Sequence, residues 1–287
     1  MITNSIALAT VTPPWGSVFC HSGAHIQNDE CGAPEFFGNG LRLVPVAGAN
    51  GKVTPAALEQ AVRSNEGHGV HSYKPSALSL TQATEGGTVY SIDEIRALCD
   101  SAHAMGMKTH MDGARFANAV ASLRVHPKEL TWRSGVDVLT FGGTKNGMPM
   151  GEAVVFFDKR LAGEFDYRCK QAGQLASKMR YLSAPWLGLL KDGAMLRHAG
   201  HANACARELA DAIAAIPGIK LVHPTEANAV FAQLPEDTIT ALRHKGWVFY
   251  TFIGSGHCRF MCSWATRQED ITALANDIQS IMHKKDT

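Results

Sequence analysis

Short apolar runs alternate with helix-like stretches over the first two-thirds of the chain. The runs are bounded by turn residues, which is typical of strands. Two of the stretches between them carry helix starts: Ser91 and Glu94 form a capping-box pattern, and Thr54-Pro55 puts proline at a first helical position. Strand–helix–strand repetition predicts a mostly parallel sheet with helices on both faces, an α/β fold. Strands are expected at 17–20, 41–46, 77–81, 108–111, 136–141 and 153–157.

The pattern changes after residue 157. Residues 158–173 are polar, and a long helical pattern over about 184–216 ends at Pro217-Gly218. The rest of the chain predicts a small α+β unit, with strands at 229–234, 247–252 and 258–263 and helices at 237–245 and 269–283. We place a boundary between 160 and 185, which divides the chain into a large domain, 1–170, and a small C-terminal domain, 171–287.

Composition and charge narrow the class of protein. The 287 residues are 45% hydrophobic, enough for a sizeable core, and 18% are charged. Lys plus Arg number 27 against 26 Asp plus Glu, so there is no broad basic surface for nucleic acid and no acidic tail. No apolar run approaches the roughly 18 residues of a membrane span. We therefore expect a small-molecule partner rather than a nucleic acid or a membrane.

The cysteines and the N-terminus indicate the compartment. The first residues lack the basic start and the cleavage pattern of a signal peptide. Seven cysteines are scattered along the chain, which favours reduced thiols in a cytoplasmic protein. Cys258 and Cys262 form an isolated C-x-x-x-C, and without a second pair nearby we expect no structural zinc site.

Two predicted strand ends carry candidate chemistry. The segment His110-Met-Asp112-Gly-Ala-Arg115 places a carboxylate at the carboxyl edge of the sheet, where open α/β sheets bind ligands. The segment Gly-Gly-Thr-Lys145-Asn-Gly presents one lysine after a second strand. Capping of the next helix by Asp112 and a solvated loop position for Lys145 are the structural alternatives.

An acid and a lysine in one crevice suit one cofactor closely. A lysine sheltered from water loses its proton more readily and becomes a nucleophile toward carbonyls. Pyridoxal phosphate needs such a lysine for its covalent attachment and an acid that keeps its ring nitrogen protonated. The protonated ring then takes up negative charge from the substrate Cα.

Six motifs in a fixed order carry a family resemblance. They include Ala24-His25-Ile with Asp29-Glu-Cys-Gly-Ala-Pro-Glu, then Gln82-Ala-Thr-Glu-Gly-Gly, and the Asp112 and Lys145 segments. Residues 168–180 and 259–264 complete the set. The sequence resembles the threonine aldolase family, in the β-eliminating lyase group of fold-type I pyridoxal-phosphate enzymes.

The resemblance implies roles at the cofactor. Lys145 resembles the lysine that holds pyridoxal phosphate covalently, and Asp112 matches the acid that pairs with the ring nitrogen. His25 matches a histidine stacked on the ring and is a candidate base for the substrate β-hydroxyl. Lys178 and Arg180 fall where the family supplies cations to the cofactor phosphate.

Arginines are implied at the substrate. Arg115 and Arg259 match residues that hold the substrate carboxylate, a task that suits a planar guanidinium. Either could instead be structural, Arg115 as a salt-bridging residue and Arg259 within a β-rich tail.

Two features leave alternatives open at His25. The spacing of His21, His25 and Asp29 would allow metal binding from one helix face. Some family members carry a second histidine where this chain has Gln82-Ala-Thr-Glu85, so proton transfer here rests on His25, Glu85 or water.

The first residue of this sequence aligns within a phosphate-binding motif of the family. Met1 stands about where the family has the threonine of a phosphate-binding Gly-Thr turn at a helix N-terminus, followed here by a helical pattern over 3–9. We expect an N-terminally shortened family member that retains cofactor poorly, and full cofactor occupancy of the purified chain would contradict this.

The implied activity is retro-aldol cleavage of a β-hydroxy-α-amino acid, with L-threonine or L-allo-threonine giving glycine and acetaldehyde. Other reactions on the same cofactor scaffold, such as β-elimination or transamination, and a non-catalytic remnant are the alternatives. Fold-type I sites are generally shared between subunits, so the resemblance implies a homo-oligomer, a dimer or tetramer, if the N-terminal segment is present.

Overall fold

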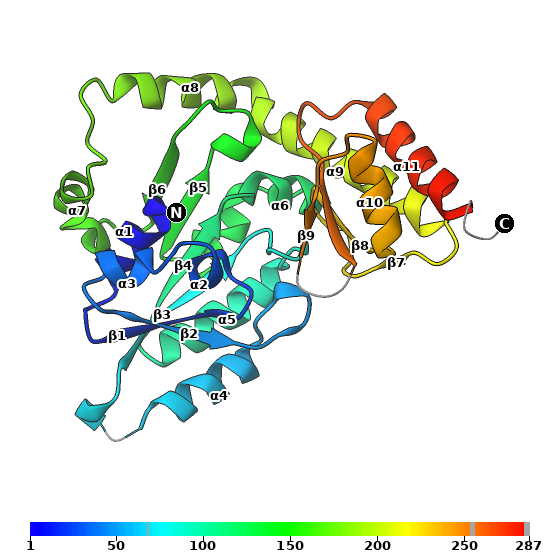
Figure 1. Cartoon of the computed structure of the whole chain (residues 1–287). Helices are drawn as coiled ribbons and strands as arrows, with labels where there is room; N and C mark the ends of the chain where they lie inside the picture. Colours follow the sequence, from blue (N-terminus) through cyan, green and yellow to red (C-terminus); the bar gives the residue numbers. More distant parts are fainter. Residues whose placement is uncertain (68, 253–255, 284–287) are drawn as a thin grey trace.

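The computed structural model of the chain describes residues 1–67, 69–252 and 256–283. Two sheets organise it: a six-stranded sheet and a four-stranded one, which lie at opposite ends of the molecule in Figure 1. In the described part of the chain, no helix combines the length and apolar character needed to cross a membrane. The seven cysteines are all free.

The large sheet has the order β2-β1-β3-β4-β5-β6. Neighbouring strands are parallel except at the edge, where β6 runs antiparallel to β5. The mostly parallel sheet expected from the sequence is therefore confirmed. Its strands are β1 (Gly16–His21), β2 (Arg42–Val46), β3 (Lys74–Thr81), β4 (Lys108–Gly113), β5 (Val138–Gly142) and β6 (Glu152–Phe156).

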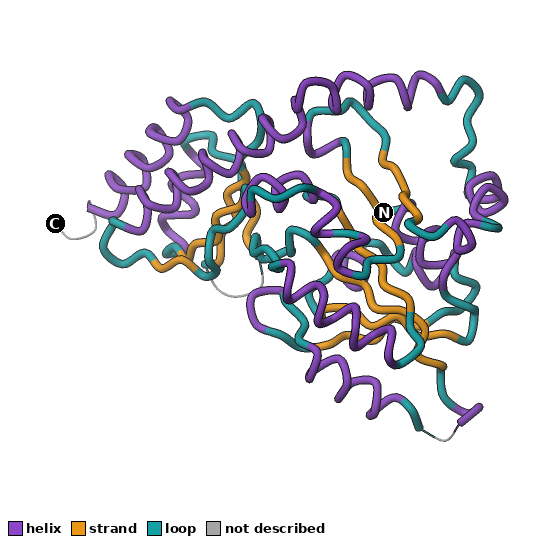
Figure 2. Tube along the Cα trace, turned by 180° about the vertical axis from the view of Figure 1, so that it is seen from behind, coloured by secondary structure: helices purple, strands orange, loops and turns teal. Residues whose placement is uncertain are grey.

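Helices cover both faces of this sheet because its strands are apolar on both sides. Alternate residues of β1 serve different cores: Phe19 packs with the face that holds Leu58 and Ile95, whereas Val18 packs with the face that holds Leu8. The first face carries α4 (Pro55–Asn65), α5 (Ile92–Ala104) and α6 (Phe116–Leu123), and the second carries α1 (Ile2–Val11). In Figure 2 the molecule is seen from behind, and the helices of the first face lie in front of the strands.

The helix starts follow the expected chemistry. Ser91 and Glu94 make both hydrogen bonds of a capping box at α5, and the Thr54 side chain accepts from Ala57 N at the start of α4. Two short helices next to the large sheet, α2 (His25–Asn28) and α3 (Ala33–Phe37), have no counterpart among the sequence predictions.

The four-stranded sheet is antiparallel, in the order β7-β8-β10-β9. Its core joins apolar residues of the strands to three helices, α9 (Ala194–Ala214), α10 (Glu236–His244) and α11 (Gln268–His283). Its strands are β7 (Lys220–Leu221), β8 (Ala229–Gln233), β9 (Tyr250–Thr251) and β10 (His257–Met261). The division of the chain into domains 1–170 and 171–287 stays a prediction.

The single long helix expected over 184–216 is wrong. The chain instead forms α8 (Arg180–Leu190), a break at Lys191–Gly193, and α9. Asp192 and Gly193 adopt positive φ angles of 53° and 68°, which a continuing right-handed helix does not allow.

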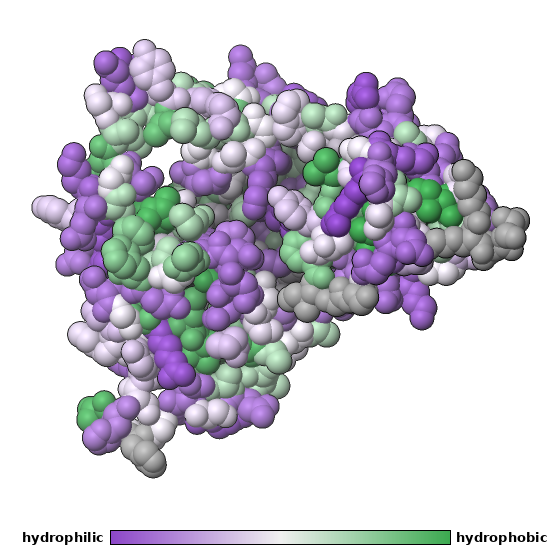
Figure 3. All heavy atoms as spheres, in the orientation of Figure 1, coloured by the Kyte–Doolittle hydropathy of each residue, from purple (hydrophilic) through white to green (hydrophobic). Residues whose placement is uncertain are grey.

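The segment from α7 (Phe165–Gln171) to α8 forms an arm that touches the large sheet near its two ends, where Phe165 contacts Phe156 of β6 and Trp186 contacts Phe141 of β5. Figure 3 shows an opening between this arm and the body of the molecule. Residues 173–181 are exposed throughout, and large apolar side chains point to solvent along the arm, including Tyr167 at 80%, Tyr181 at 70% and Leu187 at 76% exposure. Single exposed apolar residues are ordinary, but a run of them on one arm is typical of an interaction surface.

Candidate active site

The ends of β4 and β5 bring the two predicted chemical groups to one edge of the large sheet. Asp112 pairs in register with Thr140, and the chain continues from β5 into a 3₁₀ turn, Thr144–Asn146, that carries Lys145. Glycine permits this approach, because a Cβ at Gly142 would lie 2.7 Å from both Cα and O of Ala114. The Gly-Gly preceding Thr144 is therefore needed to seat the lysine turn beside Asp112.

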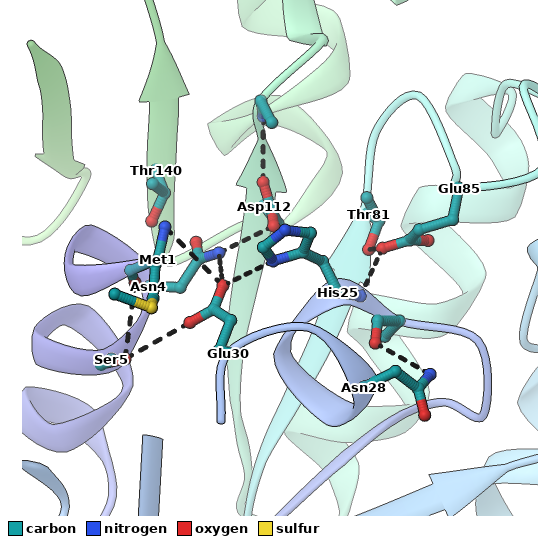
Figure 4. A network of polar contacts seen from close by, with 12 residues as sticks. Met1, Asn4, Ser5, His25, Asn28, Glu30, Thr81, Glu85, Asp112 and Thr140 are labelled. Atoms are coloured by element: carbon teal, nitrogen blue, oxygen red, sulfur yellow. Dashed lines mark hydrogen bonds and ion pairs between the residues drawn. The ribbon is translucent and has the colours of Figure 1, made fainter. Parts of the chain in front are cut away.

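Asp112 is held by hydrogen bonds to both carboxylate oxygens. Its Oδ1 accepts from Ala114 N at 2.9 Å and its Oδ2 from Asn4 Nδ2 at 2.7 Å. The same Asn4 amide donates to Glu30 Oε1 at 2.9 Å, so a residue of α1 links two buried acids (Figure 4). Asp112 is 4% exposed and Glu30 1%, and charge buried to this degree needs such partners.

His25 lies against this network. Its Nδ1 is 2.9 Å from Glu30 Oε1, and Figure 4 shows the ring beside Asp112. The hydrogen bond to the Glu30 carboxylate raises the pKa of His25, burial opposes the rise, and the charge of Asp112 adds to it. The imidazole remains 38% exposed, so it is positioned by a buried acid while one part of the ring faces outward.

Lys145 is electrostatically coupled to the site. Burial lowers the pKa of its amine, the charge of Arg115 lowers it further, and Asp112 and Glu152 oppose both. The residue as a whole stays exposed, so solvent reaches part of the side chain. Because Asp112 and Arg115 both act on this amine, the acid and the lysine belong to one site.

Glu152 fixes the turn that carries Lys145. Its Oε2 accepts from Gly143 N at 2.8 Å, and its Oε1 accepts from Thr144 Oγ1. On the far side, His198 Nδ1 lies 3.0 Å from Asn146 O. A carboxylate of β6 and an imidazole of α9 thus flank the turn that carries the lysine, although no sequence motif identifies either residue.

Arg115 and Arg259 form the cationic side of the site. Burial lowers the pKa of Arg115, and the nearby charge of Arg259 lowers it further. The Nε atoms of both arginines are buried without a hydrogen-bond partner within the described chain. Arg259 lies 4.4 Å from the ring centroid of Phe252. Two adjacent guanidinium groups with unused donors are suited to an anionic ligand.

Glu85 closes the site beside His25. Its Oε1 accepts from His25 N at 2.7 Å and from Thr81 Oγ1 at 2.9 Å. Its Oε2 is buried and has no partner within the described residues. Burial raises the pKa of Glu85 to about 7, and the charge of Asp112 adds to the rise.

Lys178 and Arg180 lie on the exposed arm, and in the described part of the chain neither makes a hydrogen bond or an ion pair with the residues around Asp112, so their assignment to the cofactor phosphate stays a prediction. The alternative of metal binding from one helix face is excluded for His21, His25 and Asp29, because His21 ends β1, His25 begins the four-residue helix α2, and Asp29 follows it. No cluster of three potential metal ligands occurs among the described residues.

Comparisons with known proteins identify the class of protein to which the chain belongs. The sheet order and the groups at its strand ends define the fold of the fold-type I pyridoxal-phosphate enzymes. A sphingosine-1-phosphate lyase from Burkholderia pseudomallei shares this fold at a TM-score of 0.74 with 16% identity, covering 98% of this chain and 69% of that one. The sequence model of the beta-eliminating lyases matches residues 1–237, and the chain belongs to this family.

Within this class, the chain is similar to several named threonine aldolases. The chain is 54% identical to a low specificity L-threonine aldolase from a Pseudomonas species and 55% identical to one from Pseudomonas aeruginosa, in each case over 97% of this chain and 80% of the relative. A threonine aldolase structure from Leishmania major superimposes at a TM-score of 0.90 with 28% identity, covering 98% of this chain and 81% of that one.

Proposed function

We propose that this protein cleaves β-hydroxy-α-amino acids such as L-threonine and L-allo-threonine to glycine and an aldehyde, with pyridoxal phosphate as cofactor. The observation that carries the proposal is that Asp112 and Lys145 follow neighbouring strands at one edge of the sheet. Beside them lie Arg115 and Arg259, whose Nε donors have no hydrogen-bond partner within the described residues. The 54–55% identity to low specificity L-threonine aldolases supports the choice of reaction.

The residues present fit pyridoxal phosphate. Asp112 is held as an oriented anion by Asn4 and Ala114, which suits a partner for a protonated ring nitrogen. Lys145 has a lowered pKa, which suits an amine that must attack an aldehyde. His25 offers a partly exposed ring whose position Glu30 fixes. These three residues would hold the cofactor ring.

When bound, the cofactor supplies an electron-withdrawing ring that stabilises negative charge at the substrate Cα. The chain supplies the rest. Arg115 and Arg259 bind the substrate carboxylate and orient the amino acid. Asp112 holds a proton at the ring nitrogen, and the lowered pKa of Lys145 leaves an amine able to take a proton and return it. A carboxylate or imidazole beside the β-carbon must accept the hydroxyl proton, and His25 and Glu85 are the groups placed to do so.

We propose that the working form is a homo-oligomer. Lys178 and Arg180 lie on the exposed arm and do not touch the site of their own chain, so cations on this arm are available to a second copy. The exposed Tyr167, Tyr181 and Leu187 support burial of the arm against such a copy. Light scattering of the purified protein tests this, and a monomer at all concentrations would contradict it.

The proposed activity is tested by product analysis. The purified chain is incubated with pyridoxal phosphate and L-threonine or L-allo-threonine, and we expect glycine and acetaldehyde in equal amounts. Pyruvate with ammonia, or a keto acid, would instead indicate elimination or transamination. Borohydride reduction followed by peptide mapping should place the cofactor on the peptide that contains Lys145, and attachment elsewhere would contradict the assignment.

A further inference from the structure

Three carboxylates line the site, and their oxygens are satisfied to different degrees. Asp112 accepts a hydrogen bond at each oxygen, and so does Glu30, whose Oε2 accepts from Ser5 Oγ at 3.4 Å. Glu85 differs, because Oε1 has two donors and the buried Oε2 has none. A buried oxygen without a donor is costly for a charged carboxylate but natural for a group that carries a proton part of the time.

The position of Glu85 is fixed by its neighbours. His25 N and Thr81 Oγ1 both donate to Oε1, so the carboxyl group is anchored at one oxygen and the other is left for a further contact (Figure 4). The anchoring backbone belongs to His25, a residue of the proposed cofactor site. The carboxyl group of Glu85 therefore adjoins the proposed cofactor site, and the charges of Asp112 and Arg115 both interact with it.

On the basis of the proposed function, we infer that Glu85 is the catalytic base that takes the proton of the substrate β-hydroxyl, through its free Oε2. The inference selects Glu85 over His25, because the hydrogen bond to Glu30 raises the pKa of His25 and favours the protonated imidazole, which has no nitrogen free to accept a proton. It assigns His25 and Glu30 to positioning and leaves proton transfer at the β-carbon to one carboxyl group.

The proposed step balances without an oxidant or reductant. The hydroxyl proton moves to Glu85 Oε2, and the O–H bonding pair becomes the second bond of the aldehyde C=O. The Cα–Cβ bond breaks with its electron pair remaining on Cα, and Cα then takes up one proton to give glycine. One proton is released at the hydroxyl and one is consumed at Cα, so the net reaction leaves Glu85 free to act again.

The charge around Glu85 supports a group that titrates near neutrality. Burial raises its pKa to about 7, Asp112 raises it, and the hydrogen bonds from His25 N and Thr81 lower it. The base acts in its charged form, so cleavage should increase as pH rises through about 7. The titratable and charged groups that interact with Glu85 are Cys20, Tyr90, Asp112 and Arg115, with His25 bonded through its backbone.

The deciding variant is Glu85→Gln, which keeps the shape and removes the ability to accept a proton. With added pyridoxal phosphate and L-threonine, we expect cleavage to fall by about 100-fold or more. Exchange of the glycine α-proton with deuterium oxide should persist within about twofold, since it involves no β-hydroxyl. A lower cleavage rate with retained glycine exchange indicates loss of the base. Loss of folding or of cofactor would instead lower the rates of both cleavage and exchange.

A second variant tests the titration. Thr81→Val removes a hydrogen bond that stabilises the charged carboxylate, so the lower limb of the pH profile should move to higher pH, whereas Thr272→Val on the exposed face of α11 should leave it in place. Infrared difference spectra of the protein without cofactor, taken between pH 6 and 8, should show a carboxyl titration that Glu85→Gln removes.

The outcomes distinguish the two proposals. If the unmodified protein with pyridoxal phosphate releases no aldehyde from L-threonine, the proposed function fails and this inference fails with it. If the unmodified protein cleaves threonine and Glu85→Gln cleaves it equally fast with the same pH profile, the proposed function stands and the inference about Glu85 is overturned. Parallel loss of cleavage and glycine exchange in a folded Glu85→Gln protein would also overturn it.

Discussion

The acidic and cationic sides of the candidate site differ in how far the chain itself satisfies them. Every carboxylate oxygen of Asp112 and Glu30 accepts a hydrogen bond from this chain. The Nε atoms of Arg115 and Arg259 are buried without a partner within the described residues, and the charge of Arg259 adds to the lowering of the pKa of Arg115 by burial. The acids are built into the folded state, whereas the arginines are left with binding capacity for an anion.

The two sides are therefore expected to contribute to different properties, the acidic side to folding stability and the arginine side to substrate binding. Removing a donor from the acidic side should reduce stability, because a buried charge loses its compensation. Removing a cation from the arginine side should reduce substrate binding at little cost to folding, because its Nε makes no hydrogen bond to the described residues that could be lost. Functional sites often trade stability for binding in this manner, and substitutions on the two sides measure the trade directly.

The largest effect is expected at Lys145, which lies between the two sides. Lys145→Ala should lower turnover by about 1000-fold or more, because the amine that attaches the cofactor is lost. Steady-state kinetics on threonine, together with the visible absorbance of added pyridoxal phosphate, measure this. Lys159→Ala, at an exposed lysine outside the site, is the matched control. Activity that survives in Lys145→Ala would show that the lysine is misassigned.

Asp112→Asn tests the charge of the acidic side with its shape retained. The amide has one acceptor oxygen, so it can accept from Ala114 N or from Asn4 Nδ2 but not from both, and it cannot hold a proton at the cofactor nitrogen. We expect turnover to fall by about 100-fold, as for loss of one preorganised electrostatic contact, with a lower melting temperature because one buried donor loses its acceptor. Asp93→Asn, at a side chain 93% exposed, should change neither. Unimpaired turnover in Asp112→Asn would limit Asp112 to a structural role.

Arg115→Ala tests the cationic side. Loss of a charged hydrogen bond to the substrate carboxylate should raise KM by about 10- to 100-fold. Thermal stability should stay the same or increase, because the variant removes a buried cation that lies near Arg259 and whose Nε has no hydrogen-bond partner within the described residues. Arg133→Ala, which removes a surface pair with Glu129 and a cation–π contact with Trp132, is the control. A lower melting temperature for Arg115→Ala together with an unchanged KM would contradict the division between the two sides.

The strand ends could be predicted from the sequence because their signals are local. Short runs of strand-forming residues predict β4 and β5, and the Asp-Gly and Gly-Gly-Thr segments mark where each strand ends. Parallel pairing then brings Asp112 and Lys145 to one edge by geometry alone. The same reasoning found the capping box of α5, whose two hydrogen bonds join residues three apart.

The supporting residues could not be predicted because their contacts are distant in sequence. Asn4 is separated in sequence from Asp112 by 108 positions and from Glu30 by 26. Its role as their shared donor is visible only once α1 is packed against the large sheet. Glu152 and His198 contact the turn at Lys145 only after β6 and α9 are in place. The break at Asp192 follows from a positive φ that residue composition does not specify. Local patterns predict elements, whereas the partners of buried charges depend on tertiary packing.

The smallest expected effect concerns the donor that joins the two acids. Asn4→Ala removes one amide that donates to both Asp112 and Glu30, and leaves their buried oxygens with fewer donors. We expect a loss of about 2 kcal/mol in the free energy of unfolding, within the range for an unsatisfied buried polar group, measured by denaturant titration. Asn276→Ala, on the exposed face of α11, controls for loss of an asparagine without a buried partner. Because Asn4 touches no proposed substrate group, its KM for threonine should stay near that of the unmodified protein, the reverse of Arg115→Ala. If Asn4→Ala instead raised KM and left the unfolding free energy unchanged, the acidic side would not be the structural half of the site.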